Sequence, residues 1–597
     1  MKASPEPQEP PALGDPSPQS AGLTPVPGAP PEGAEFTLRA LVGGCLIGSL
    51  LAISNVYMGM KTGWWESGSI MAVVLGFSGL SAMDRRKGRA PGMLETNLVQ
   101  TAASSVGAMP AAAGLLGTLP ALALMGLSVP AWSVVIWGAS LGVIGVLATH
   151  LLRRRLLEEE ALAFPTGVAT AELVTAMHQG GQVRQPGRAR ALLGAGLSSV
   201  AVTWLRDVLT WVPAMTAAPG RLGTLPAATL TWGFGWNPLA LGIGIIVGLP
   251  MGLSVLLGAV LAWGVIAPTL VDAQVLDASK GYEEFATWLT WPGVGLMVGS
   301  AVVSLAAQAR SLLGAVRDLR ALGGVAEGTS RWLMGAGLAT CTLVLVLGYG
   351  VFGLSLPHIL MALALVLPLC AVCGRGAGQM DVAPVGAMGQ VAQAASGTLF
   401  PGSPTLNVAA GSVVAGAAAQ TGVSLWSLKA GHLLGASPSR QLHAQLLGVL
   451  VGAAVSVPAY LLLVKAYGLG SEALPVPTAH QFRAVAELAT LGLSGLPPYA
   501  ARAAAIGFAV GAALTLAARG KLERFVPSAV AMGIGFILPA YFAVTIATGS
   551  LLAALVRRVR PQELGQHLPA LGAGTIAGES LTGLTIAGLR ALGVIQG

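Results

Sequence analysis

Long apolar segments, each about 20 to 30 residues in length, follow one another from residue 36 to residue 594. An α-helix needs about 20 such residues to cross the hydrocarbon core of a bilayer. Charged residues make up only 10% of the chain, compared with about 25% in an average soluble protein. This is too little charge to cover the surface of a soluble protein of 597 residues. The pattern therefore predicts an all-α polytopic membrane protein surrounded by the lipid bilayer.

Clusters of basic residues separate several of these segments, at 85–89, 153–155, 184–190, 317–320 and 557–560. Such clusters are typical of cytoplasmic loops. Two predicted spans, 36–61 and 64–83, precede the first cluster, so we expect a cytoplasmic N-terminus in a multi-pass protein of the inner (plasma) membrane. The net charge of +8 then reflects membrane orientation, and we expect no nucleic-acid partner.

The chain contains a repeat. Residues 1–34 are rich in Pro, Gly, Ser and Glu, which predicts a disordered tail. After this tail, "TLRALVGGCLIGSLLAISNVYMGMKTG" at residue 37 aligns without gaps on "TLNVAAGSVVAGAAAQTGVSLWSLKAG" at residue 405, which places Lys61 on Lys429. "FPTGVATAE" at residue 164 also resembles "VPSAVAMG" at residue 526. We therefore expect two repeated transmembrane halves, 35–356 and 357–597, an arrangement typical of secondary transporters.

Two segments predict helices that enter the membrane without crossing it. Residues 157–181 lie between two basic clusters that should share one side, so we expect a re-entrant helix starting at Pro165. The Gly-rich segment 374–397 is predicted to be a second broken element. With these, we expect about 14 to 16 transmembrane or re-entrant helices. The other predicted spans are 93–118, 130–152, 190–216, 237–270 (broken near 248–250), 286–316, 332–353, 357–373, 405–428, 441–466, 498–518, 526–556 and 570–594.

Several motifs resemble the oligopeptide transporter (OPT) superfamily, which includes the yellow-stripe-like carriers of metal–nicotianamine complexes. They are "NVYMGMKTGW", "ALAFPTGVATAE", "SLKAGHLLGASPSRQLHAQLLGVLVG", "VPSAVAMGIGF" and "AGESLTG". They occur in the family's order from residue 36 onward. The resemblance implies a bacterial-type member with a duplicated multi-span fold. It also implies proton-coupled symport of oligopeptides or peptide-like metal chelates into the cytoplasm, with any metal carried as cargo.

Two other function classes stay open: a membrane-embedded enzyme, and a channel without proton coupling. An enzyme would need a nucleophile with a base, or metal ligands such as HExxH, and neither pattern is visible. Lys61 follows Met60, so the Gly-Lys pair of a nucleotide-binding loop is missing as well. We therefore expect no catalytic residue, no bound metal and no cofactor. A homo-oligomer is among the states that the sequence leaves open.

Polar side chains within apolar segments are the candidate substrate ligands. Lys61 is expected either to face a central cavity and pair with a carboxylate, or to extend to the membrane interface. Amides in the broken element suit either a polar ligand or packing hydrogen bonds. The candidate substrate-binding residues are Asn55, Tyr57, Lys61, Gln100, Gln379, Gln390, Asn407 and Lys429.

Four acids are candidates for proton coupling: Glu95, Glu172, Asp381 and Glu579. Glu172 ranks first, because a carboxylate on a re-entrant helix is expensive in lipid and can exchange a proton near neutral pH. A structural, hydrogen-bonded Glu172 is the alternative, and Glu95 is equally compatible with an interfacial position. Arg206 and Asp207 are expected to form buried structural ion pairs, each with a partner elsewhere, because neighbours on a helix point about 100° apart.

Overall fold

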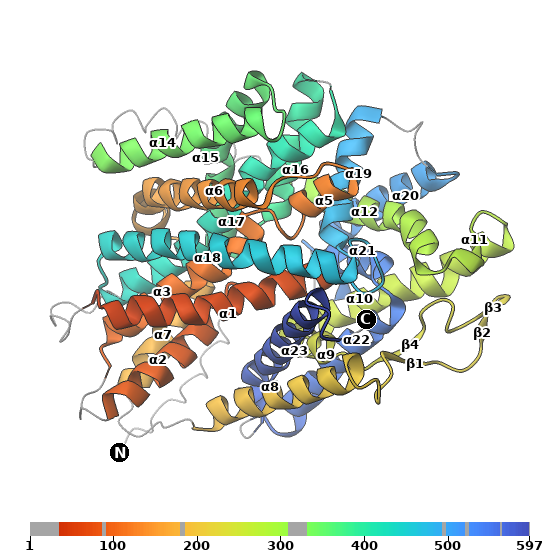
Figure 1. The fold of residues 1–597 in the computed structure, drawn as a ribbon, viewed down its shortest axis with the longest axis horizontal. Coiled ribbons are helices and arrows are strands. Elements are labelled where there is room, and N and C mark those ends of the chain that lie inside the picture. Colours follow the sequence, from red (N-terminus) through yellow and green to blue (C-terminus); the bar gives the residue numbers. More distant parts are fainter. Residues whose placement is uncertain are drawn as a thin grey trace, which may run out of the picture.

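The computed structural model describes residues 35–85, 91–179, 186–307, 331–400, 402–491, 497–519, 525–561 and 564–595. The predicted tail and the basic cluster at 317–320 lie outside these residues, as do parts of the clusters at 85–89 and 184–190. The described chain is almost entirely helical, with a few short strands at one end (Figure 1).

The helices differ widely in length, and several come in broken pairs. They are α1 (Leu38–Thr62), α2 (Ser69–Arg85), α3 (Met93–Gly107), α4 (Met109–Ala112), α5 (Thr118–Leu124), α6 (Ala131–Arg153), η1 (Arg154–Glu159), α7 (Pro165–Gln179), α8 (Pro186–Asp207), α9 (Pro238–Val247), α10 (Leu249–Ala259), η2 (Val260–Ile266), α11 (Ala267–Asp272), η3 (Ala278–Lys280), α12 (Tyr282–Ala307), α14 (Arg331–Gly350), α15 (Leu356–Met380), α16 (Val385–Leu399), α17 (Pro404–Leu434), α18 (Pro438–Tyr467), α19 (Pro477–Leu491), α20 (Ala500–Ala517), α21 (Ala529–Ile537), α22 (Ala540–Val559), η6 (Gly565–His567) and α23 (Leu568–Ala591). Four short strands form two antiparallel two-stranded sheets: β1 (Met215–Ala217) pairs with β4 (Gly233–Gly235), and β2 (Arg221–Leu222) with β3 (Leu225–Pro226).

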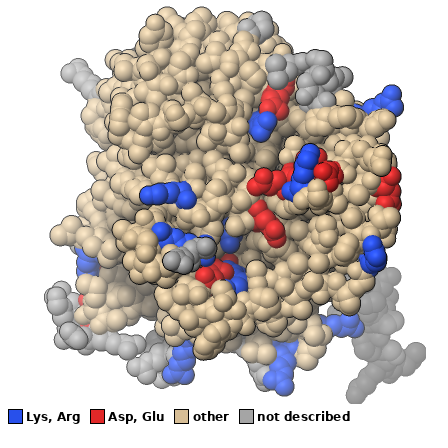
Figure 2. Space-filling view, turned by 45° about the vertical axis from the view of Figure 1, so that its right-hand side comes forward, with Lys and Arg blue, Asp and Glu red and all other residues tan. Residues whose placement is uncertain are grey.

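The predicted all-α polytopic membrane fold is confirmed. Within the described residues, ten helices are long and apolar enough to cross a bilayer. Large apolar side chains such as Leu38, Leu197 and Leu338 are more than two-thirds exposed, as expected for surfaces that face lipid. Figure 2 shows one face of the molecule on which neutral residues dominate and charges occupy only scattered patches.

Several predicted spans are interrupted where the sequence contains Gly or Pro. The predicted span 93–118 is wrong, because α3 ends at Gly107 and the chain turns before α5. The span 526–556 is likewise divided at Pro539 into α21 and α22. The predicted break near residues 248–250 is confirmed: Gly248, with φ of 79°, separates α9 from α10.

Other boundaries also differ from the prediction. The span 190–216 ends at Asp207, and the chain then forms the strand-containing segment before α9. The Gly-rich element begins later than expected, because α15 continues to Met380 and the break comes at Asp381–Pro384, before α16. The helix predicted from Pro165 is present as α7. Helix α19 was not predicted, because it is too polar to stand out as a membrane span.

The long helix α17 lies in the centre of the molecule, and its most apolar stretch is completely buried. Its many small residues let neighbouring backbones approach closely. A Cβ atom at Gly416 would come within 2.3 Å of the carbonyl oxygen of Ala112. α1 runs antiparallel to α17, because Glu35, just before α1, accepts a hydrogen bond from the amide of Ser437, three residues after the end of α17. Lys61 and Lys429 therefore lie toward opposite ends of the molecule.

A second internal repeat emerges once the helices are placed. "EALAFPT" at residues 160–166 and "EALPVPT" at 472–478 share five of seven residues, and each leads into a 15-residue helix, α7 or α19. In both, the residue before the proline has positive φ, 48° at Phe164 and 41° at Val476. The segment at residue 164 is thus matched better by residues 472–478 than by "VPSAVAMG", which begins the nine-residue α21. α7 and α19 lie at opposite ends of the molecule (Figure 1).

Candidate functional site

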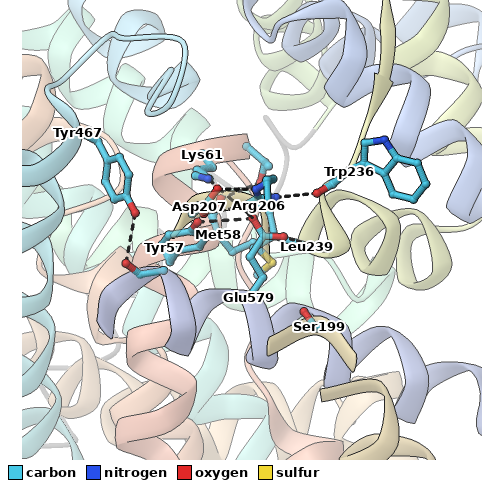
Figure 3. Close-up of polar contacts among 12 residues, drawn as sticks. Tyr57, Met58, Lys61, Ser199, Arg206, Asp207, Trp236, Leu239, Tyr467 and Glu579 are labelled. Carbon is cyan, nitrogen blue, oxygen red and sulfur yellow. Dashed lines mark hydrogen bonds and ion pairs between the residues drawn. The ribbon is translucent and has the colours of Figure 1, made fainter. Parts of the chain in front are cut away.

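A buried carboxylate, Glu579, lies at the centre of an ionic cluster. It occupies the middle of α23 and has no exposed surface. Its oxygens accept hydrogen bonds from Arg206 (3.1 Å), the backbone amide of Leu239 (2.8 Å) and the hydroxyl of Tyr57 (3.5 Å). The ammonium group of Lys61 lies 3.8 Å away. Figure 3 shows these side chains converging from α1, α8 and α23.

The start of the half-helix α9 points at the same carboxylate. Leu239 is in the first turn of α9, where backbone N–H groups have no partner within the helix and attract negative charge. The side-chain amide of Asn237, oriented to donate, lies 2.6 and 2.7 Å from the two oxygens of Glu579. Glu579 therefore fills a position that resembles an anion-binding site at a helix N-terminus.

Arg206 joins the two acids of the cluster. Its guanidinium group pairs with Asp207 at 2.6 and 2.8 Å and also donates to the carbonyl oxygen of Trp236 at 2.8 Å. The buried ion pair predicted for Arg206 is confirmed. The expectation that both neighbours find partners elsewhere is only half right, because Asp207 pairs with Arg206 itself at the end of α8, where the helix gives way to a loop.

Arg590 and Tyr467, which were not among the candidates from the sequence, complete the cluster. The guanidinium group of Arg590 donates to the carbonyl oxygen of Asp207 at 3.4 Å and lies 5.6 Å from the ring centre of Tyr467. The ammonium group of Lys61 lies 4.5 Å from the ring of Tyr57. Arg590 follows Glu579 by 11 residues, about three helical turns, so their position on one side of α23 was a usable signal.

The cluster carries more positive than negative charge. With every group ionised, three cations (Lys61, Arg206 and Arg590) face two carboxylates (Asp207 and Glu579). An excess positive charge away from water attracts anions and strengthens each contact with them. A pocket of about 220 Å³ borders Asn237 and is lined by residues of α8, α9, α22, α23 and the segment around β4.

Asn55 and Gln100, two other candidates, make structural contacts. The amide of Asn55 donates to the carbonyl oxygens of Glu66 and Gly107 and accepts from the amide of Glu66. It thereby fixes the non-helical segment after α1 against the end of α3. Gln100 donates to the hydroxyl of Ser104 on α3 and to that of Ser427 on α17.

Lys429 and Asp381 lie near the opposite end of the molecule from Lys61. Lys429 donates to the carbonyl oxygen of Leu162 at 2.9 Å. Asp381 accepts hydrogen bonds from the backbone and side chain of Thr166 at the start of α7. Neither residue belongs to the Glu579 cluster.

Glu95, Glu172 and Gln379 are also placed outside the cluster. Glu95 is buried and bound by Arg39, whose Nε and Nη2 each donate at 2.6 Å. Glu172 and Gln379 have exposed side chains, on α7 and at the end of α15. The burial that made Glu172 the leading candidate for proton coupling is therefore not found, and its role stays a prediction. Gln390 on α16 and Asn407 on α17 are both buried.

Comparisons with known proteins cover almost the whole chain, and all of them point to one family. A family model described as OPT oligopeptide transporter protein matches residues 35–590. The chain is 28% identical to a putative oligopeptide transporter of Haemophilus influenzae, with 91% of this chain and 93% of that protein covered. It is 26% identical to the putative oligopeptide transporter YGL114W of Saccharomyces cerevisiae, with 84% and 88% covered. It is 25% identical to the metal-nicotianamine transporter YSL2 of Oryza sativa, with 92% of each covered. The chain therefore belongs to the OPT family and is a membrane transporter.

Proposed function

We propose that this protein is a secondary symporter that uses a proton gradient to import oligopeptides or peptide-like metal chelates into the cytoplasm. The Glu579 cluster is the main support. It combines a buried carboxylate, an excess of cations and a helix N-terminus within one contact network. Relatives named as oligopeptide and metal–nicotianamine transporters support the two substrate classes.

The proposed mechanism follows from competition between the carboxylate of the substrate and the carboxylate of Glu579 for the same donors. Peptides and metal chelates both carry carboxylate groups, which Lys61, Arg206 and the start of α9 are suited to bind. In the absence of substrate, Glu579 occupies these donors. A proton on Glu579 removes its negative charge and releases the cations, so proton binding favours substrate binding. By linkage, substrate binding favours proton uptake to the same degree, which is the basis of symport.

Charge distribution supports a cytoplasmic N-terminus. α6 and α22 end in basic clusters, and the C-terminal ends of these helices carry Arg153, Arg557 and Arg558. Acids instead gather around the start of α12, at Glu283 and Glu284. By the positive-inside rule the ends of α6 and α22 are cytoplasmic. Lys61, on the far side from Lys429, then faces the periplasmic half of the membrane.

The test is uptake of radiolabelled tri-alanine, or of a labelled metal–nicotianamine complex, into proteoliposomes with an acidic exterior. We expect wild type to accumulate substrate above the external concentration and to lose this ability when a protonophore is added. Glu579→Gln keeps the shape and hydrogen bonding of the side chain but cannot titrate. It should still exchange substrate across the membrane and fail to accumulate it.

Glu172→Gln is the matched control, since Glu172 is an exposed acid on α7. If Glu579→Gln accumulated substrate normally and Glu172→Gln did not, proton coupling would be assigned to α7 instead. A wild type that only equilibrates substrate, with or without a gradient, would indicate a channel and overturn the proposal.

A further inference from the structure

The pocket of about 220 Å³ that borders Asn237 lies directly against the Glu579 cluster. It opens to the surface beside Ser198 and Trp236, two lining residues that are both exposed. In Figure 3, Trp236 and a third lining residue, Ser199, lie on the side of the cluster opposite Tyr467. We call this space the α8–α9 pocket.

Two residues belong to both the α8–α9 pocket and the cluster. Trp236 lines the pocket, and its carbonyl oxygen accepts a hydrogen bond from Arg206 at 2.8 Å. Asn237 also lines the pocket, and its side-chain amide, oriented to donate, lies 2.6 and 2.7 Å from the oxygens of Glu579. On α23, Thr575 lines the pocket about one helical turn before Glu579. A carboxylate that replaced Glu579 on these donors would therefore place its neighbouring atoms at the pocket.

The lining of the α8–α9 pocket suits an apolar group. Val202, Phe234 and Leu241 contribute carbon surfaces, and none of the described residues that line the pocket is ionisable. The hydroxyl groups of Ser199 and Thr575 each donate to a backbone carbonyl oxygen at 2.7 Å. Because these donors are already engaged, a polar group would give up hydrogen bonds to water on entering and regain few of them. A hydrocarbon group instead gains by leaving water.

The volume of the α8–α9 pocket matches a single large side chain. An apolar cavity of about 150 Å³ is enough to bind benzene. Pockets that enclose a whole small molecule usually measure about 300–1,000 Å³. At about 220 Å³, this pocket can hold one side chain of the size of Phe or Leu but not a whole tripeptide.

We propose that the α8–α9 pocket receives the apolar side chain of a peptide's C-terminal residue while the terminal carboxylate binds at the Glu579 cluster. The proposal rests on the transport function proposed above and narrows its substrates to peptides that end in a large apolar residue. In such a residue the carboxylate and the side chain share one Cα atom, so they enter adjoining sites together. A lipid acyl chain is the competing occupant, but it would leave the excess positive charge of the cluster without an anion.

The test is equilibrium binding of radiolabelled Ala-Ala-Phe and Ala-Ala-Gly to the full-length protein in lipid nanodiscs. Wild type should bind Ala-Ala-Phe at least about tenfold more tightly, the usual effect of burying a large apolar side chain. Val202→Phe extends a ring into the pocket and should bind the two peptides alike. Val200→Phe is the matched control, because Val200 lies on the same helix but is 38% exposed and outside the lining of the pocket. It should keep the wild-type preference.

A second comparison isolates the C-terminal position. Phe-Ala-Ala has the same composition as Ala-Ala-Phe, but its ring is two residues away from the carboxylate. Wild type should therefore bind Phe-Ala-Ala about tenfold more weakly than Ala-Ala-Phe. If Val202→Phe does not fold, Leu241→Phe narrows the same pocket from α9 and should likewise remove the preference for Ala-Ala-Phe.

The outcomes separate this inference from the proposed function. Equal binding of Ala-Ala-Phe and Ala-Ala-Gly to wild type, or of Ala-Ala-Phe and Phe-Ala-Ala, would overturn the side-chain pocket and leave peptide transport standing. A preference unchanged in Val202→Phe, combined with loss of a phospholipid that stays bound to wild type in native mass spectrometry, would assign the pocket to an acyl chain instead. No binding of any of the three peptides to wild type would overturn both the pocket and peptide recognition.

Discussion

Asp381 accepts two hydrogen bonds from Thr166, one from its backbone amide at 3.0 Å and one from its hydroxyl at 2.6 Å. The two residues are 215 positions apart, at the end of α15 and the start of α7. A carboxylate at this position satisfies an N–H that has no partner within the helix and interacts favourably with the helix dipole. Asp381 thus caps α7 from a different part of the chain.

Removing this cap should destabilise the protein. Asp381→Ala is expected to lower the free energy of unfolding by about 1 kcal/mol, the usual value for a lost N-cap. Thr166→Val removes only the hydroxyl bond and should cost less. Thr478→Val is the matched control, because Thr478 holds the equivalent position in the second "EALxxPT" motif. Among the described residues no side-chain hydrogen bond involves its hydroxyl, so its replacement should change the melting temperature least.

An Asp381→Ala variant as stable as wild type would contradict the capping role. If Asp381→Asn also folded normally but lost proton-driven uptake, Asp381 would regain the coupling role that the sequence suggested. Thermal unfolding and proteoliposome uptake, measured on the same preparations, distinguish these outcomes.

Glu579 should contribute to stability as well as to transport. Glu579→Leu leaves Arg206 and the amide of Leu239 buried without this acceptor. Breaking a buried pair on one side costs about 3–5 kcal/mol, and Asp207 limits the loss because it still pairs with Arg206. We therefore expect a marked fall in melting temperature for Glu579→Leu and a small one for Glu579→Gln. Equal melting temperatures for Glu579→Leu and wild type would show that the cluster is not a stabilising network.

Sequence patterns predicted most of the apolar spans and the break at Gly248, and they marked Lys61 and Glu579 as candidate site residues, because each leaves a local trace. They failed where the outcome depends on packing between distant segments. Arg206 and Glu579 are 373 positions apart, and no local pattern states that α8 and α23 are neighbours. Glu172 illustrates the same limit: its flanking residues predicted the helix α7 correctly but not that the side chain would be exposed.

Close packing of α8 on α23 should be essential to the cluster. A Cβ at Gly578 would lie 2.4 Å from the carbonyl oxygen of Gly196, too close for any side chain. Gly578→Val should force the helices apart, displace Glu579 from Arg206 and lower the melting temperature by several degrees, in line with overpacking costs of about 1–3 kcal/mol. Gly194→Val is the control, since a Cβ there meets nothing within 4 Å. Equal melting temperatures for the two variants would refute this account of the interface.

The final prediction concerns Glu160, which follows the long helix formed by α6 and η1 and begins the first "EALxxPT" motif. Partial burial opposes its ionisation, but hydrogen bonds from Arg375 and Arg155 outweigh that effect and lower its pKa below the ordinary value of 4.5. Arg375 approaches its carboxylate at 2.6 Å from α15. The pair therefore links the loop before α7 to α15.

Because the pKa is lower in the folded protein than in the unfolded chain, the ionised carboxylate stabilises the fold. This stabilisation is fully present above the unfolded pKa and disappears as the pH falls through the folded pKa. Wild type should therefore exceed Glu160→Gln in melting temperature by a constant amount at neutral pH, and the difference should shrink once the pH falls below about 4.5. Glu159→Gln is the control, because Glu159 is more exposed and pairs, among the described residues, with the exposed Arg154. A wild-type advantage over Glu160→Gln that persisted unchanged at pH 3 would show that the pair with Arg375 is not its source.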